Sequence, residues 1–536
     1  SLMFVPSVYI QSIYHSMKHI FSAFLATLVF AGVAQAQNPI IQTKYTSDPA
    51  PYVHGDTVYL FTDHDNAVRD GYDMTEWLLY TSTDMVNWTD HGPVASLADY
   101  GRWASTADNG AWASQVLEYQ GKWYMYNAIQ LRGVGVLCAD SPYGPWTDPK
   151  KQHLFNFSIN DIDPTVYVDD DGQPYIYWGN NGLWYAKLDK ERMYRLKPIN
   201  KRYTVPLTEA TVGGYKVKNS KGGDSLLVGS DCFEEASWVY KRGSKYYLVY
   251  AGGPIPEHLS YAMADSITGP WKYMGKIQNT PENSFTTHPA VIDYKGHSYL
   301  FTHSGQLKGG NGFHRSVCAM EFHYNDDGTI PFLTLPPKEG NISPVGHLDA
   351  LSRQEAETIN YANGITTHKD SSTVDVASNK VYVEGIDNND YIRVRSVNFG
   401  NDGVGSINVC VRSGANAGSI ILSIDNVERT TINVPSELVK WTVLSATLPD
   451  KVTGIHNITF TFKASGKNPS ERKNLFAFDY WQFLPGATDI QSANMEQKTG
   501  GRSRVYDLNG RCVGSSLKGL PQGLYVYDGR KVMVTE

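Results

Sequence analysis

Three carboxylates stand at matching places in a repeated pattern, and their side chains could do acid–base chemistry. Asp48 lies in SDPAPYV, Asp163 in DIDPTVYV and Glu235 in EEASWVY, each seven to nine residues before a glycine. Two carboxyl groups across a polar pocket can cleave a glycosidic bond. One, kept protonated, donates to the leaving oxygen, and the other, ionised, activates a water molecule. A third can raise the pKa of the acid by like-charge repulsion and orient it.

The same offset from a glycine reaches an aromatic residue and a histidine. Trp112 lies in GAWASQV and His288 in THPAVIDY. A tryptophan offers a flat apolar face to a sugar ring. Charged side chains that point inward are costly unless they are paired or used, so their recurrence indicates a common site. The alternative is that Asp48 and Asp163 only cap turns before proline, as Asp often does.

The elements that must position these residues are predicted by the repeat itself. Five segments have a tight glycine turn followed by alternating apolar and aromatic residues, which is typical of a hairpin. They are VHGDTVYLF (53–61), YQGKWYMYN (119–127), DDGQPYIYW (170–178), KRGSKYYLVY (241–250) and YKGHSYLFT (294–302). Their glycines are roughly 50 to 70 residues apart, which fits one four-stranded blade plus loops. We therefore predict a five-bladed β-propeller over residues 38–345; the alternative is a β-sandwich with unrelated hairpins.

A propeller explains why the offset matters. The innermost strand of each blade lines a central channel, and the hairpin glycine follows that strand. Residues at one offset before the glycine therefore lie at the same end of the same axis. Five blades would bring Asp48, Asp163 and Glu235 towards a single ligand.

Two further domains and an export signal are predicted. A Pro/Gly-rich stretch (330–346) marks a boundary, and residues 350–485 show the short alternating strands of a β-sandwich or jelly roll. A polar linker then leads to a small strand-rich module at 490–536. Residues 17–36 have a basic start, an apolar run and an Ala-x-Ala end, the pattern of a signal peptide too short to span a membrane as a mature helix.

Charge and cysteine content exclude several classes of partner. The formal net charge is −7, which argues against binding to nucleic acid or to an anionic membrane. Five cysteines without CxxC spacing indicate neither a zinc site nor a disulfide framework. We expect an all-β monomer that is not inserted in a membrane.

The three carboxylate motifs resemble those of glycoside hydrolase family 43. The resemblance implies that Asp48 is the catalytic base, Asp163 the modulator of the acid and Glu235 the general acid. Glu234 competes for the acid role because strand parity does not decide between neighbours, and the family's Glu-Ala-Ser run favours Glu235. The family inverts the anomeric configuration and needs no cofactor for the chemistry. Its members are mainly α-L-arabinofuranosidases, β-D-xylosidases and endo-arabinanases.

The resemblance also implies substrate contacts. His288 falls where members of the family have a histidine on the axis, near a bound metal ion or water. Arg315, in GFHRSVCAMEF, resembles an arginine that reaches the sugar hydroxyls; the alternative is a surface ion pair. His258 and the run Asp63-His64-Asp65 are further candidates for the rim of the pocket.

Residues 350–485 resemble a family 6 carbohydrate-binding module, through RQEAETINYANGI and NLFAFDYWQF. The resemblance implies a structural calcium ion, held by oxygen ligands from Glu355, Glu357 and Asp479. The chain departs from the family at Gly385 and Leu438, where members carry aromatic residues that sandwich a sugar. The module is therefore expected to bind through another face or to brace the propeller.

The C-terminal segment VYDLNGRCVG…LPQGLYVYDGRKVMV is similar to the sorting domain of the Bacteroidetes type IX secretion route. This likeness implies a cell-surface or extracellular location, with the periplasm as the alternative. Together the resemblances imply a secreted inverting glycosidase that acts on plant cell-wall polysaccharide or oligosaccharide and removes terminal α-L-arabinofuranosyl residues from arabinoxylan or arabinan. The alternatives are a β-D-xylosidase of the same family and a non-catalytic glycan-binding propeller.

Overall fold

The computed structural model describes most of the chain and confirms the all-β prediction. The described residues are 38–66, 68, 70–104, 109–218, 225–336, 340–370, 380–466, 473–485, and parts of 505–534. The predicted signal peptide, residues 17–36, lies outside them. Helix is confined to α2 (Glu209–Val212) and the 3-10 turn η1 (Leu97–Asp99) in these ranges, and none of it has the length and apolar character that a membrane crossing requires.

The first sheet is an antiparallel meander in chain order. Its strands are β1 (Thr46–His54), β2 (Thr57–His64), β3 (Glu76–Ser82) and β4 (Trp88–Ser96). Gly55, in the turn between β1 and β2, has a φ of +59°, which glycine adopts without steric cost. Consecutive residues of the central strands are buried, such as Leu60 and Phe61 in β2 and Leu78 and Leu79 in β3, so both faces of the sheet are covered.

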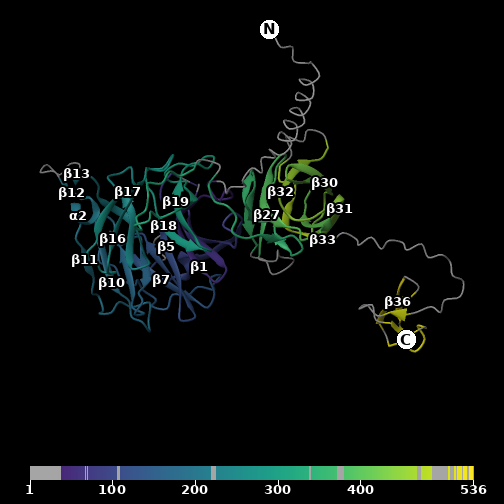
Figure 1. The fold of residues 1–536 in the computed structure, drawn as a ribbon, viewed down its shortest axis with the longest axis horizontal. Coiled ribbons are helices and arrows are strands. Elements are labelled where there is room, and N and C mark those ends of the chain that lie inside the picture. Colours follow the sequence, from purple (N-terminus) through teal and green to yellow (C-terminus); the bar gives the residue numbers. More distant parts are fainter. Residues whose placement is uncertain are drawn as a thin grey trace, which may run out of the picture. The chain divides into compact units, whose positions relative to one another are not determined.

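Four more antiparallel sheets follow along the chain, and in each of them neighbouring strands are consecutive in the sequence (Figure 1). They are β5–β7 (Ala111–Tyr119, Lys122–Ile129, Gly133–Ala139), β8–β11 (Thr165–Val168, Pro174–Trp178, Leu183–Lys187, Tyr203–Val205), β14–β17 (Phe233–Arg242, Lys245–Gly252, His258–Ala264, Lys272–Gln278) and β18–β20 (Ala290–Tyr294, His297–Ser304, Ser316–Phe322). A separate hairpin, β12 (Gly214–Lys218) and β13 (Ser225–Gly229), is inserted before β14. All five hairpins expected from the glycine repeat form.

The first strands of the five sheets contact one another in a closed order. β1 contacts β5, β5 contacts β8, β8 contacts β14, β14 contacts β18, and β18 contacts β1. The ends of this region are joined by backbone hydrogen bonds, because Ile40 N donates to Val317 O (2.9 Å) and Thr46 N to Arg315 O (2.8 Å). The first strands thus surround a common centre, and the N-terminal segment fastens the last sheet to the first.

Residues 348–485 form the expected β-sandwich. One sheet has β21 (Leu348–Asp349), β27 (Tyr391–Asn398), β32 (Ile455–Ala464), β29 (Gly418–Ile424) and β30 (Val427–Val434), with β24 (Tyr361–Asn363) beside β27. The other has β25 (Thr366–Lys369), β26 (Val381–Glu384), β33 (Ala477–Pro485), β28 (Val404–Arg412) and β31 (Thr442–Val452), with β22 (Gln354–Glu355) beside β33. Apolar side chains from both sheets, such as Val394, Val409, Phe460 and Trp481, form its buried core.

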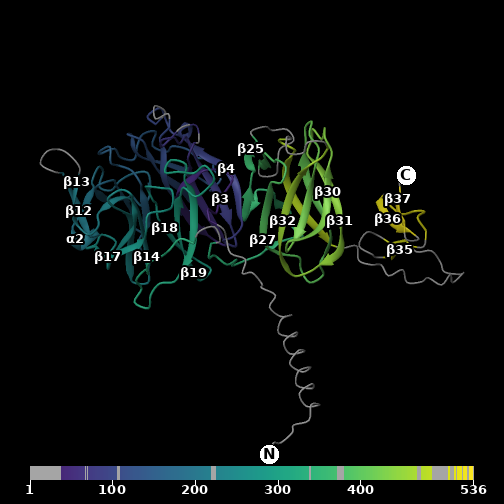
Figure 2. The ribbon, with the colours of Figure 1, turned by 90° about the horizontal axis from the view of Figure 1, so that it is seen from above.

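The second domain lies against the first sheet, with β25 beside β4 (Figure 2), and another of its strands extends that sheet. β23 (Thr358–Ile359) pairs antiparallel with β4, so that the edge of that sheet is covered. Beside this pair, the Asn87 side chain donates to Arg395 O (2.8 Å) and accepts from Arg395 N (2.9 Å). Asn360 Nδ2 donates to Val86 O (2.8 Å). The β23–β4 pairing and these side-chain hydrogen bonds therefore join the two domains.

The C-terminal residues form a compact unit of their own. The division between the two units falls after residue 486. β34 (Val505–Tyr506), β35 (Cys512–Gly514), β36 (Gly523–Tyr527) and β37 (Arg530–Val534) make a four-stranded sheet in the order β35-β34-β36-β37. The expected strand-rich character of the 490–536 module is observed in these residues.

Substitution Asn87→Ala is expected to loosen the contact between the domains. It removes both partners of the Arg395 backbone in a buried place, which should lower the free energy of unfolding by about 1–3 kcal/mol. Chemical denaturation measures the change. Asn408→Ala is the matched control, because this half-buried amide bonds to Ser445 within the sandwich, and a loss below about 1 kcal/mol is expected. Equal losses in the two variants would contradict the proposed role of Asn87.

Candidate active site

The backbone is distorted at the positions of the predicted carboxylates. The pairing of β1 with β2 skips from Ser47 to Ala50, and β14 is irregular on either side of Glu235. Asp48 and Asp163 have φ angles of +47° and +56°. Positive φ is uncommon for residues other than glycine, and β-bulges re-aim side chains beside active sites. The distortions turn these side chains away from regular strand positions.

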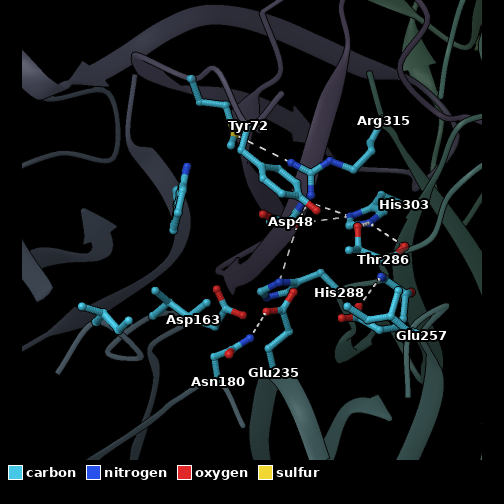
Figure 3. Close-up of a pocket in the computed structure, with 16 residues that line it drawn as sticks. Asp48, Tyr72, Asp163, Asn180, Glu235, Glu257, Thr286, His288, His303 and Arg315 are labelled. Carbon is cyan, nitrogen blue, oxygen red and sulfur yellow. Dashed lines mark hydrogen bonds and ion pairs between the residues drawn. The ribbon is translucent and has the colours of Figure 1, made fainter. Parts of the chain in front are cut away.

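A pocket of about 320 Å³ lies where the sheets converge (Figure 3). It is lined by all six residues predicted from the sequence: Asp48, Trp112, Asp163, Glu235, His288 and Arg315. Its volume is at the lower end for ligand pockets, so it suits one small group rather than a long chain.

Asp48 is surrounded by positive or polar nitrogen groups. Its Oδ1 lies 3.2 Å from Arg315 Nη1, 3.2 Å from His303 Nδ1 and 3.7 Å from His288 Nδ1. Burial alone would raise the pKa of Asp48, but the Arg315 guanidinium and the two histidines outweigh it and lower the pKa below its ordinary value. Asp48 is therefore ionised at neutral pH, as a base must be.

Arg315 is buried, with 3% of its surface exposed, so the surface ion pair considered as an alternative is wrong. Its Nε and Nη2 donate to the two oxygens of Asp65 (2.9 and 2.8 Å), and Nη2 also donates to Ser47 Oγ (2.9 Å). The two-point pairing fixes the plane of the guanidinium, which is then aimed at Asp48. Arg315 thus holds Asp48 and also lines the pocket.

Glu235 occupies the other side of the pocket, where Asn180 Nδ2 donates to its Oε2 (2.6 Å). Burial, followed by the charge of Asp48, raises the pKa of Glu235 to about 7 against the lowering effect of the Asn180 hydrogen bond. Glu234 is not among the pocket's lining residues; its Oε2 pairs with Lys216 Nζ (2.5 Å). The geometry therefore favours Glu235 over Glu234 as an acid.

Asp163 accepts a hydrogen bond from Ala236 N (2.9 Å), directly beside Glu235 in the chain. Burial and the charge of Glu235 raise the pKa of Asp163 well above its ordinary value. Two adjacent buried carboxyl groups resist simultaneous ionisation, so protonation of one favours ionisation of the other. This arrangement is compatible with a modulating role for Asp163.

The two neutral pocket residues predicted from the sequence also lie on its wall. Burial lowers the pKa of His288 to about 4, so its imidazole is neutral at pH 7. Trp112 is half-buried in β5 and contacts Tyr72 edge to face, with ring centroids 6.2 Å apart. Both residues can contact a sugar without adding charge.

The residues expected at the rim lie elsewhere. His258 is paired with Asp231 (3.1 Å), and His64 with Glu76 (2.8 Å); neither lines the pocket. Asp65 is buried beneath Arg315. Asp63 is fully buried, and burial and the nearby Asp48 raise its pKa well above the ordinary value. The prediction failed because these side chains are paired with other residues or buried behind Arg315, which residue spacing in the sequence does not show.

Ten of the sixteen residues that line the pocket were not predicted, among them Tyr72, Asn180, Glu257 and His303. Glu257 directly precedes His258, so the choice was wrong by one residue; its carboxylate accepts from Thr287 N (2.9 Å). His303 donates through Nε2 to Thr286 O (3.1 Å) and lies near the end of the strand after the fifth glycine turn. The equivalent positions after the other turn glycines, such as Thr62 and Tyr250, do not line the pocket, so the repeat gave no signal for it. Tyr72 and Asn180 lie in connections that carry no repeat.

The calcium site stays a prediction. Arg353 Nη2 lies 3.0 Å from Asp479 Oδ2, and Arg353 Nε lies 3.4 Å from Glu355 Oε1. Glu357 is buried in the same region. The oxygen donors suit calcium, but a guanidinium already supplies positive charge to two of the three. In the described ranges no group of three or more His, Cys, Asp or Glu side chains is arranged to hold a metal ion, at His288 or in the sandwich.

Comparison with known proteins covers both large domains. Residues 36–330 match the family Glycosyl hydrolases family 43, and residues 355–485 match the Carbohydrate binding module (family 6). An arabinoxylan arabinofuranohydrolase from Paenibacillus polymyxa is 29% identical over 86% of this chain and 77% of its own length. One from Bacillus subtilis is 29% identical over 83% of this chain and 92% of its own length.

Two further matches differ in coverage. A xylosidase/arabinosidase from Bacteroides ovatus is 31% identical over 54% of this chain and 95% of its own length. The crystal structure of a Bacillus subtilis family 43 arabinoxylan arabinofuranohydrolase in complex with cellotetraose aligns with a TM-score of 0.67 and 25% identity, covering 84% of this chain and 97% of that one. The family match spans more than half of the chain and includes the pocket. This protein belongs to glycosyl hydrolase family 43 and carries a family 6 carbohydrate-binding module.

Proposed function

We propose that this glycoside hydrolase removes terminal α-L-arabinofuranosyl residues from arabinoxylan or arabinan, with inversion of configuration. The observation that supports this most is the contrast between two carboxyl groups in one pocket. Arg315 favours the ionised form of Asp48, whereas burial favours the protonated form of Glu235. Titratable groups whose environments push their pKa values apart are the usual sign of an acid–base pair.

In the proposed mechanism Asp48 removes a proton from water, which attacks the anomeric carbon. Glu235 gives its proton to the leaving oxygen, and the bond to the sugar breaks. Asp163 is proposed to influence the proton affinity of Glu235 and to orient the backbone beside it through Ala236. Trp112, His288 and Arg315 are proposed to contact the sugar in the small pocket.

The relatives favour arabinose over xylose as the group removed. The two arabinoxylan arabinofuranohydrolases match across both domains, whereas the xylosidase/arabinosidase matches about half of this chain. That relative keeps β-D-xylosidase activity as the second candidate. A non-catalytic glycan-binding propeller would have no need for the opposed carboxyl environments.

The proposal also includes the fold of the catalytic region and the location of the protein. We infer that the five sheets are the five blades of one propeller over residues 38–345, because their first strands contact in a closed order. The signal-like residues 17–36 and the sorting-domain-like residues 490–536 support export to the cell surface or medium, with the periplasm as the alternative.

The assay that tests the activity compares aryl α-L-arabinofuranoside with aryl β-D-xyloside. We expect faster release from the arabinofuranoside, and a loss of about 10²–10⁴-fold in kcat for Asp48→Asn and for Glu235→Gln. Glu234→Gln is the control for the neighbouring carboxylate and should retain most of the activity once its folding is verified by circular dichroism. No cleavage of either substrate, nor of arabinan or arabinoxylan, would refute the proposal; preference for the xyloside would favour the second candidate.

The pH dependence of kcat/KM tests the acid. Glu235 must be protonated, so activity should fall as pH rises through about 7, and the Asp48 limb should lie below its ordinary pKa. Asn180→Ala removes a hydrogen bond that lowers the Glu235 pKa, so the alkaline limb should move to higher pH. Asn180→Asp should move it further by adding negative charge. A limb that stays in place or moves to lower pH in both variants would exclude Glu235 as the acid.

A further inference from the structure

A large groove separate from the catalytic pocket lies between the two domains. Its volume is about 1180 Å³, more than three times that of the catalytic pocket. The propeller side is formed by the N-terminal segment (38–45) and by residues 306–308. The sandwich side is formed by residues 361–366 and by the turn that leads to Tyr391 in β27. The groove is large enough for several linked sugar residues.

The walls of the groove are fixed relative to each other. Ala362 N donates to Gln42 Oε1 (3.1 Å) across the groove floor. Lys44 bonds to Asp90 (2.7 Å) and also to the hydroxyl of Thr367 in the sandwich. Together with the β23–β4 pairing, these contacts fix the distance between the two walls of the groove. A preformed groove binds a chain at lower entropic cost than a surface that must close.

Charges in the groove are largely compensated within the protein. Lys473 pairs with Asp387 (2.5 Å) and Lys44 with Asp90 (2.7 Å). The carboxylate of Asp65 is paired with the guanidinium of Arg315 (2.8 Å). An ion would find few unpaired opposite charges there, whereas an uncharged ligand rich in hydroxyl groups would find amide, hydroxyl and carboxylate partners.

Aromatic faces accompany these polar groups. Tyr361 and Tyr391 are half-buried neighbours on adjacent strands, with ring centroids 6.0 Å apart. On the other wall Tyr45 is stacked on His314 at 5.2 Å. Asn363 and Asn388 add amide groups to the sandwich side. Partly exposed tyrosines present an apolar ring and a polar tip, which suits a sugar ring and its hydroxyls.

One segment borders both cavities. Gln306 and Lys308 line the groove, whereas Arg315 lines the catalytic pocket. Phe313 lies between Lys308 and Arg315 in the sequence. Its ring packs edge to face on the ring of Tyr72 in the pocket, with centroids 5.1 Å apart. A polymer held in the groove would therefore lie next to the catalytic site without entering it.

We propose that this groove binds the main chain of the neutral polysaccharide from which the catalytic pocket removes side groups. The proposal rests on the proposed function for the identity of that chain, a β-linked xylan. The cleft around Gly385 is the weaker site, because its described lining residues include Glu384 and Arg412 but no tyrosine or tryptophan. The sandwich thus contributes to binding through the side that faces the propeller.

Binding is tested on the full chain with Asp48→Asn, which separates binding from turnover. Affinity electrophoresis in soluble arabinoxylan and titration with linear xylohexaose measure the dissociation constants. Tyr361→Ala with Tyr391→Ala should weaken binding at least tenfold, because both aromatic faces are lost. The pair of Tyr→Phe substitutions keeps the rings and should stay within about threefold of the parent. Arg412→Ala at the Gly385 cleft should change binding little.

Two further measurements distinguish loss of binding in the groove from a general loss of structure or activity. In the active chain, the tyrosine substitutions should raise KM for arabinoxylan and leave kcat/KM for the aryl arabinofuranoside unchanged. Hydrogen exchange of the Asp48→Asn chain should slow in residues 361–366 and 387–391 when xylohexaose is added, which needs no substitution in the groove. Unchanged exchange in these residues would overturn the proposal that the groove binds the main chain. Unchanged polymer binding by the folded variant with Tyr361→Ala and Tyr391→Ala would overturn it as well. Absence of cleavage by the active chain would instead refute the proposed function, since binding is measured independently.

Discussion

The buried contact of Arg315 with Asp65 and Asp48 is the interaction on which the rest of the site depends. Asp48 lies in β1 of the first sheet, Asp65 directly follows β2, and the arginine directly precedes β20 of the last sheet. A buried charge whose partner is removed is strongly destabilising, so neither Arg315 nor Asp65, its two-point partner, can be lost alone without a large cost. The same ion pair therefore joins the two ends of the propeller-like region and keeps Asp48 ionised. Closure of the fold and ionisation of Asp48, the proposed base, thus depend on the same contact.

Opposite protonation states can coexist in so small a pocket because different forces act on the two carboxyl groups. Asp48 lies within hydrogen-bonding distance of a guanidinium and a histidine, which outweigh its burial. Among the described residues, the Asn180 amide is the side-chain hydrogen-bond partner of Glu235, and burial outweighs its effect. The environment, rather than the residue type, distinguishes a base from an acid. This is why two chemically similar side chains can serve in opposite roles.

Much of the site was predictable because the repeat of turn glycines fixes a position within each sheet. That position gave Asp48, Trp112, Asp163, Glu235 and His288, which all line the pocket. It could not separate Glu234 from Glu235, because the irregular pairing of β14 breaks the alternation on which side-chain direction depends. Asn180 and Tyr72 escaped because connecting segments have no period. The all-β architecture followed from turn chemistry, whereas the groove depends on how two domains meet, which no local pattern records.

The pairing of β23 with β4 has a consequence for how such proteins diversify. A ladder of main-chain hydrogen bonds joins the two domains at this edge, and main-chain atoms are the same in every sequence. Mutations can therefore reshape sugar-facing surfaces on either side while the seam between the modules is inherited unchanged. A catalytic half separated from its companion would instead expose a bare strand edge, a template for self-association.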